Sequence, residues 1–236
     1  MAIAYCGPPP APTEIATSFN ADPTAMIALA VLGVLMRRRP AGLAATAVLI
    51  VAFVSPLCAL SSALFAARSA HHLLIVAVAA PLLAAALPNW RAGPAWPWLL
   101  SSGAVLALWH LPGAYDAALS SVPVYWAMQL ALLGSASGLW RSLHDPRQTL
   151  PLRALIIVLA FAQMGLVGAL LTLAPAPLYA AHASAPLAWG LTPLDDQRLG
   201  GLIMWVAAVV PYTVAAALFC RREWALLTRD DGALSA

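Results

Sequence analysis

The sequence predicts an all-α integral membrane protein: a seven-helix transmembrane bundle with its N-terminus outside and its C-terminus in the cytoplasm. The first observation is composition, because the 236 residues are 62% hydrophobic and only 9% charged, whereas a soluble domain carries about 25% charged residues. Second, the apolar residues form seven runs near the length that crosses a bilayer. Third, the arginines concentrate in alternate connections between those runs.

The seven expected segments have recognisable boundaries. The first begins at Asp22-Pro23 and the last at Thr192-Pro193, where a capping residue precedes a proline in the first turn. Pro56 and Pro81 lie inside the second and third segments and should kink them. The segments are residues 23–38, 41–66, 69–87, 94–111, 122–141, 150–173 and 193–221. The chain then divides into an outer N-terminal tail (1–22), a transmembrane domain (23–222) and a cytoplasmic C-terminal tail (223–236).

The arginines give the orientation. With the N-terminus outside, ten arginines lie on the cytoplasmic side and only Arg68 and Arg198 lie outside, which satisfies the positive-inside rule. The net charge of +3 is small, so these arginines are topology signals and no nucleic-acid partner is expected. Gly134 and Gly138 form a G-x-x-x-G pattern that predicts tight helix packing.

The three cysteines predict no disulfide. Cys6, Cys58 and Cys220 form neither a close pair nor an even-numbered framework. Cys58 and Cys220 fall in apolar segments and are expected to be small buried thiols. The first residues lack the basic and apolar regions of a cleaved signal peptide.

Polar side chains from four separated stretches converge on the outer ends of the segments. His71 and His72 open the third segment, His110 ends the fourth, Asp116 follows in the outer loop, and Asp195, Asp196 and Gln197 open the seventh. Ionisable groups near hydrocarbon are costly and point to function. Imidazoles and carboxylates suit copper or zinc, although no H-x-x-x-H or H-E-x-x-H spacing is present.

Each of these residues also has a plain structural interpretation. His71 and His110 can sit in the wet interface, and Asp195 and Asp196 can act as partners of a helix dipole. Arg68 can snorkel to headgroups or pair with an aspartate. His182 lies in the long outer loop, where either interpretation stands.

Four stretches carry a resemblance to a known family. They are HHLLIVAVAAPLL (71–83), LWHLPGAYDAAL (108–119), APLYAAH (176–182) and PLDDQRLGGLIMW (193–205). Over residues 55–222 the chain resembles the CtaG family of cytochrome c oxidase assembly factors. The matching positions are His72, Trp109, His110, Pro112, Tyr115, Asp116, Asp196, Gln197, Gly201 and Trp205.

The resemblance implies a multi-pass protein of the bacterial cytoplasmic (inner) membrane that matures a haem–copper oxidase, at its copper centres, without catalytic turnover. Its partners would be oxidase subunits or other assembly factors, together with the lipid bilayer, and its cofactor would be copper. The expected metal ligands, sharing one outer pocket, are His72, His110, Asp116 and Asp196. The expected structural or partner-binding residues are Arg68, His71, Trp109, Pro112, Tyr115, Gln197, Gly201 and Trp205.

The chain departs from the family pattern at two places. Arg68 stands where the family has a histidine, and Tyr125, Met128 and Gln129 stand where it has an H-x-x-E-H-like cluster. These changes remove ligands, and a guanidinium opposes a bound cation unless Asp116 or Asp196 neutralises it.

Three functions therefore compete. The first is an oxidase assembly factor that assists copper insertion or the folding of copper-bearing subunits. The second is a metal-free membrane scaffold, or a resident subunit of a respiratory complex, which fits the lost histidines. The third is a small transporter or membrane enzyme; it ranks last because a transporter places its ionisable groups near the midplane.

Overall fold

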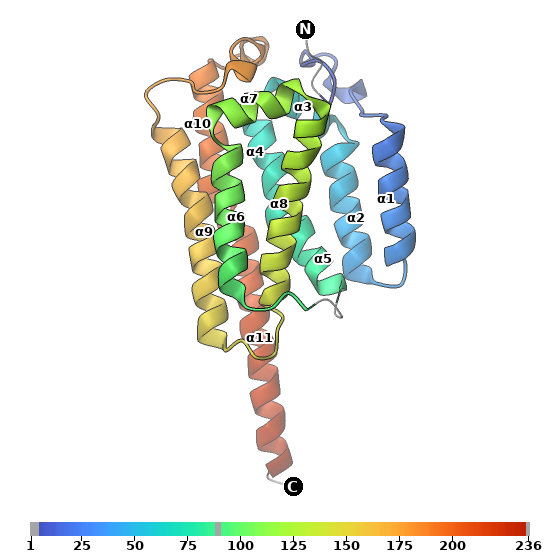
Figure 1. Cartoon of the computed structure of the whole chain (residues 1–236), viewed down its shortest axis with the longest axis vertical. Helices are drawn as coiled ribbons and strands as arrows, with labels where there is room; N and C mark the ends of the chain where they lie inside the picture. The colour runs from blue at the N-terminus through green and yellow to red at the C-terminus, as the bar shows by residue number, and fades with distance from the viewer. Residues whose placement is uncertain (1–4, 88–90, 235–236) are drawn as a thin grey trace.

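The computed structural model describes residues 5–87 and 91–234, without the side chains of residue 223 and residues 226–234. All regular structure in this part of the chain is helical, and the long helices run side by side (Figure 1). The main elements are α1 (Pro23–Met36), α2 (Pro40–Phe53), α3 (Pro56–Ala63), α4 (Phe65–Leu73), the π-helical η2 (Leu74–Ala79), α5 (Ala80–Ala86), α6 (Ala95–Trp109), α7 (Pro112–Ser120), α8 (Val122–Ser142), α9 (Leu150–Leu173), α10 (Pro193–Leu202), the π-helical η5 (Ile203–Ala207) and α11 (Val209–Leu234). Short 3-10 turns are η1 (Ile15–Thr17), η3 (Ala180–His182) and η4 (Ala185–Trp189).

The seven expected segments all fall on helices, but fewer are long enough to be assigned as spans. Among the described residues, Phe65–Ala86, Leu150–Leu173 and Pro193–Arg222 are long and apolar enough to cross a membrane. The pair α2 and α3, bent by 46° at its break, is a fourth if it counts as one span. Pro23–Met36 and Ala95–Trp109 are shorter apolar helices. The structure thus supports three or four spans, and the number seven and the orientation stay predictions.

Prolines start many of the helices, as expected at Pro23 and Pro193. Asp22 caps α1 by accepting a hydrogen bond from the Thr24 amide (2.9 Å), and Thr192 caps α10 through the Asp195 amide (3.1 Å). A proline in the first turn needs no hydrogen-bond partner for its nitrogen. Pro56 begins α3 directly after the bend, so its predicted kink is confirmed.

Pro81 lies in the first turn of α5, directly after a π-helical segment. The chain passes from α4 through η2 into α5, where the Ala80 amide donates to the Ile75 carbonyl five residues back. The next donor in that pattern would be Pro81, which has no N–H. The Trp140 indole nitrogen on α8 donates instead to the Val76 carbonyl (2.9 Å). Pro211 lies four residues beyond the second π-helical segment, η5.

Small residues allow close helix approach. A Cβ built on Gly201 of α10 would lie 2.4 Å from Thr172 Oγ1 and 2.6 Å from the Gly168 carbonyl oxygen of α9. In the predicted G-x-x-x-G pair, a Cβ on Gly138 would collide with the Trp98 ring (2.1 Å), whereas Gly134 faces open space. Tight packing at Gly138 is therefore confirmed, and it holds α8 against α6.

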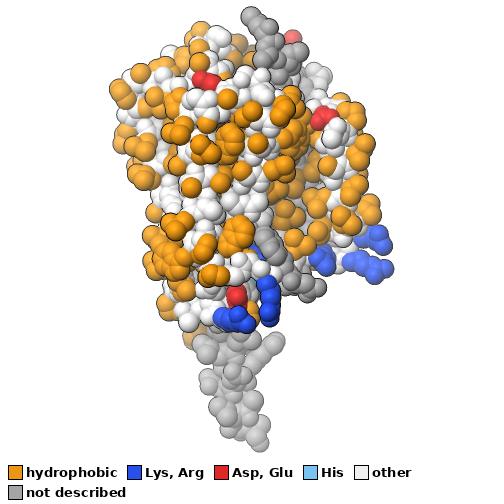
Figure 2. Space-filling view, viewed as in Figure 1, with side chains coloured by type: hydrophobic (Ala, Val, Ile, Leu, Met, Phe, Trp, Pro, Cys, Tyr) orange, Lys and Arg blue, Asp and Glu red, His pale blue; other side chains and the backbone are white. Residues whose placement is uncertain are grey.

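The surface has the character of a membrane protein. Figure 2 shows hydrophobic side chains over most of the visible face of the bundle, with arginines gathered toward the end from which α11 projects. Large apolar side chains such as Leu35, Leu170 and Leu173 are more than 60% exposed, which is unusual for a soluble monomer. We call the end from which α11 projects the arginine end. The opposite end, which is covered by residues 5–22 and 174–192, is called the tail end.

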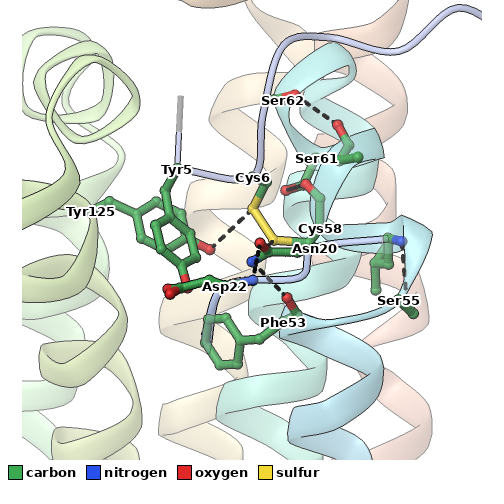
Figure 3. The surroundings of a disulfide bond; sticks show 12 residues. Tyr5, Cys6, Asn20, Asp22, Phe53, Ser55, Cys58, Ser61, Ser62 and Tyr125 are labelled. Atoms are coloured by element: carbon green, nitrogen blue, oxygen red, sulfur yellow. Dashed lines mark hydrogen bonds between the residues drawn. A yellow bond between two sulfur atoms is a disulfide. The ribbon is translucent and has the colours of Figure 1, made fainter. Parts of the chain in front are cut away.

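The N-terminal tail is fastened to the tail end by a disulfide. Cys6 is bonded to Cys58 of α3 across a sequence separation of 52 residues (Figure 3). The Tyr5 ring stacks on Tyr125 with centroids 4.7 Å apart, and the Asn20 amide donates to the Phe53 carbonyl (3.1 Å). The prediction of no disulfide is wrong, because spacing along the chain says nothing about a tail that folds back over the bundle. The predicted burial of Cys220 is also wrong, since this free cysteine is exposed.

Candidate functional site

The motif residues of the tail end first of all hold the loop 174–192 in place. Asp116 lies on the short helix α7, not in a loop as expected, because Pro112 starts a new helix directly after α6 ends. Its carboxylate accepts hydrogen bonds from the backbone amides of Ala180 (3.2 Å) and Ala181 (3.1 Å). Both oxygens are thus used to fix η3 against α7.

A second connection runs through His182. Its Nδ1 lies 3.2 Å from the Ala63 carbonyl oxygen and its Nε2 lies 2.7 Å from the Tyr115 hydroxyl. A carbonyl only accepts, so Nδ1 carries the proton and Nε2 accepts from Tyr115. Burial lowers the pKa of His182 to about 4, and burial also raises the pKa of Tyr115 above its ordinary value. The imidazole is therefore neutral and the phenol protonated at neutral pH.

Asp196 and Gln197 connect α10 to three other segments. The buried Asp196 carboxylate accepts from the amides of Phe65 (2.7 Å) and Ala66 (3.0 Å), the first residues of α4. Gln197 accepts from the Leu178 amide (2.7 Å) and donates to the Leu171 carbonyl (3.2 Å). Asp196 therefore supplies the cap that α4 lacks locally.

His110 ends α6 and receives the loop. Its Nδ1 donates to the Leu106 carbonyl (2.7 Å), and its own carbonyl accepts from the Tyr179 hydroxyl (2.9 Å). The side chain is only 8% exposed, so it does not sit in the wet interface. The neighbouring Trp109 is half-buried, and its indole nitrogen has no hydrogen-bond partner in the part of the chain that the structure describes.

Beneath this network lies a group of buried polar side chains with unused hydrogen-bonding atoms, which we call the unpaired cluster: Arg68, His71, His72 and Gln129. The following atoms are buried without a hydrogen-bond partner among the described residues: Nε and Nη1 of Arg68, both ring nitrogens of His71 and of His72, and both amide atoms of Gln129. A buried polar atom without a hydrogen bond lowers the stability of the fold, so its presence calls for an explanation such as a functional role. The unpaired cluster is therefore the candidate functional site.

Ring contacts join this cluster to its surroundings. The His72 ring lies 6.1 Å from the His110 ring and 5.7 Å from the His71 ring, centroid to centroid. The Arg68 guanidinium lies 5.3 Å from the centre of the Tyr125 ring, within the range of a cation–π interaction. Arg68 is 1% exposed, so its side chain does not snorkel to the lipid headgroups. The carboxylate of Asp196 accepts hydrogen bonds from the backbone amides of Phe65 and Ala66 and not from Arg68.

The predicted metal ligands are only partly brought together. His72 and His110 are neighbours, whereas the carboxylates of Asp116 and Asp196 hold backbone amides of η3 and α4. Among the described residues, no group of three or more His, Cys, Asp or Glu side chains could hold a metal ion. The nearby Arg68 adds a positive charge. These residues do not fit a tightly held copper centre.

The remaining predicted residues have structural places. Pro112 starts α7, Gly201 packs on α9, and Trp205 in η5 is 42% exposed on the side of the bundle. Asp195 lies in the first turn of its own helix and accepts a hydrogen bond from the Thr192 hydroxyl (2.6 Å). Tyr179 is a further residue of this network that was not predicted from the sequence, although it lies in the motif of residues 176–182 that also supplies His182.

The comparisons point to one family. The family model described as cytochrome c oxidase caa3 assembly factor matches residues 94–225, which include His110, Asp116 and Asp196. No curated protein and no solved structure matches the chain.

Proposed function

Because the chain belongs to the cytochrome c oxidase caa3 assembly factor family, we propose that it assists the assembly of a haem–copper cytochrome c oxidase by contacting oxidase subunits at its tail end. One observation carries this proposal. The His110 carbonyl at the end of α6 and polar side chains of α7 and α10 hold an ordered loop over that end, and the loop exposes apolar residues such as Leu178 and Leu187. An ordered, partly apolar surface is suited to binding another protein.

In this proposal copper-centre maturation proceeds through contact with the copper-bearing subunits, and this chain does not carry the metal. The incomplete ligand set and the adjacent guanidinium of Arg68 support that choice. An assembly role also requires no catalytic turnover.

We assign the tail end to the periplasmic side of a bacterial inner membrane. The Cys6–Cys58 disulfide supports this side, because disulfides persist in oxidising compartments. The arginines at the opposite end support a cytoplasmic location for that end.

Complementation tests the assembly role. Deleting the gene in its host should lower cytochrome c oxidase activity and the amount of assembled enzyme. The wild type and Asp195→Asn should restore both, whereas Asp116→Ala, which releases the Ala180 and Ala181 amides, should not. Unchanged oxidase activity in the deletion strain would refute the proposal.

Metal analysis tests the absence of bound copper. Anaerobically purified protein, loaded with Cu(I) and desalted, should retain no stoichiometric copper. One equivalent that is lost in the His72→Ala/His110→Ala variant would instead establish a copper site in the unpaired cluster and a direct handover role.

A further inference from the structure

A cavity of about 520 Å³ lies in the arginine-end half of the bundle, away from the candidate site. Its walls come from η2 and α5 on one side and from α11 on the other, with Trp140 and His144 at the end of α8. Apolar side chains such as Val78, Leu82 and Val214 make up most of the lining. The volume is within the range of sites that bind small molecules.

Two irregular helices form this cavity. Pro81 and Pro211 both line it, and each follows a π-helical segment, η2 or η5. π-helical segments inside helices are rare and occur often at functional sites. One of them, η2, lines the cavity through Ala77 and Val78, and the other, η5, precedes the α11 wall on the opposite side. We therefore regard the separation of α5 and α11 as built into the fold.

The apolar cavity ends at positive charge. Arg222 and His144 line the end toward the arginine-bearing connection. The pKa of His144 is lowered mainly by burial and further by the charges of Arg222, Arg141 and Arg153, so all three guanidinium groups lie within electrostatic range of this ring. Asp145, which follows His144 in the sequence, accepts a hydrogen bond from the Arg147 amide (2.9 Å).

We propose that this cavity binds an anionic phospholipid, with an acyl chain between α5 and α11 and the phosphate headgroup at Arg222. An acyl chain matches the apolar walls, and a headgroup with net negative charge matches the arginine-rich end. Basic pockets between membrane helices are known to bind anionic headgroups. A neutral lipid would match the walls but not the end of the cavity.

Native mass spectrometry on the full chain tests this site. Delipidated protein in detergent is titrated with phosphatidylglycerol or with phosphatidylcholine of the same acyl chains. The wild type should bind one phosphatidylglycerol at least about fivefold more tightly than phosphatidylcholine, the effect of one well-placed arginine. Arg222→Gln should abolish that preference, whereas the matched control Arg221→Gln, whose residue does not line the cavity, should keep it.

A second pair of variants tests the acyl-chain part. Ala215 lines the cavity and Ala217 is exposed outside it. Ala215→Trp should block binding of both lipids, and Ala217→Trp should bind as the wild type does; helix content by circular dichroism shows that both have folded. Equal affinity of the wild type for the two lipids, equal effects of Arg221→Gln and Arg222→Gln, or full binding by folded Ala215→Trp would each overturn the proposal.

Discussion

The Asp196 carboxylate provides the sharpest test of how the tail end is built. It is fully buried and caps the first two amides of α4, at 2.7 and 3.0 Å, and no other side chain in the described part of the chain does so. A hydrogen bond to a charged group contributes about 1.5–3 kcal/mol, so Asp196→Ala should lower the free energy of unfolding by roughly 3–5 kcal/mol. Asp196→Asn keeps one acceptor oxygen and should lose about half of that.

The neighbouring residue is the control. Asp195 is bonded only within its own helix end, so Asp195→Ala should cost about 1 kcal/mol or less. The assay is denaturation in mixed detergent micelles, followed by far-ultraviolet circular dichroism. If Asp196→Ala were no more destabilising than Asp195→Ala, the capping role derived from the geometry would be refuted. A variant that kept its stability but lost bound copper would identify Asp196 as a ligand instead.

Three further results are expected. The pKa of His182 is about 4 in the folded chain and about 6.5 in the unfolded chain, so the unfolded chain binds the extra proton; the contribution of His182 to the free energy of unfolding should be constant above pH 7 and fall by about 3 kcal/mol between pH 6.5 and 4, so His182→Gln should reduce the loss of stability at acid pH by about that amount. Gly201→Ala should lower the thermal unfolding temperature in detergent, because its Cβ meets Thr172 and Gly168, whereas Gly134→Ala, with nothing within 4 Å, should not. Cys6→Ala should cost about 4 kcal/mol in non-reducing denaturation, the cross-link entropy of a 52-residue separation, and a reductant should remove the difference from the wild type.

The positions of the helices were predictable because the controlling interactions are local. Apolar runs and first-turn prolines such as Pro23 and Pro193 act within a few residues, and the helices begin there. The number of membrane spans was not predictable, because α1 and α6 have only 14 and 15 residues. Hydropathy alone cannot decide whether such helices cross a bilayer.

The candidate site was predictable as a location but not as chemistry. Depth along the segments placed His72, His110, Asp116 and Asp196 at one end, and the structure agrees. Their hydrogen-bond partners could not be predicted, because Asp196 binds amides about 130 residues away in the sequence and no sequence periodicity indicates such a contact. Arg68 shows the same limit: its replacement of a family histidine was visible, but its burial beside Tyr125 was not.

The hydrogen bond from Trp140 to the Val76 carbonyl makes the residue at position 140 depend on the residue at position 81. The acceptor is available because Pro81 has no N–H to offer it, and Trp140 supplies the missing donor from another helix. A substitution that restored an N–H at position 81 would provide a competing donor, and loss of the indole would leave a bare carbonyl in an apolar environment. We expect each substitution alone to destabilise the fold and the two together to destabilise it less than the sum of both. Positions 81 and 140 are therefore expected to covary among related chains.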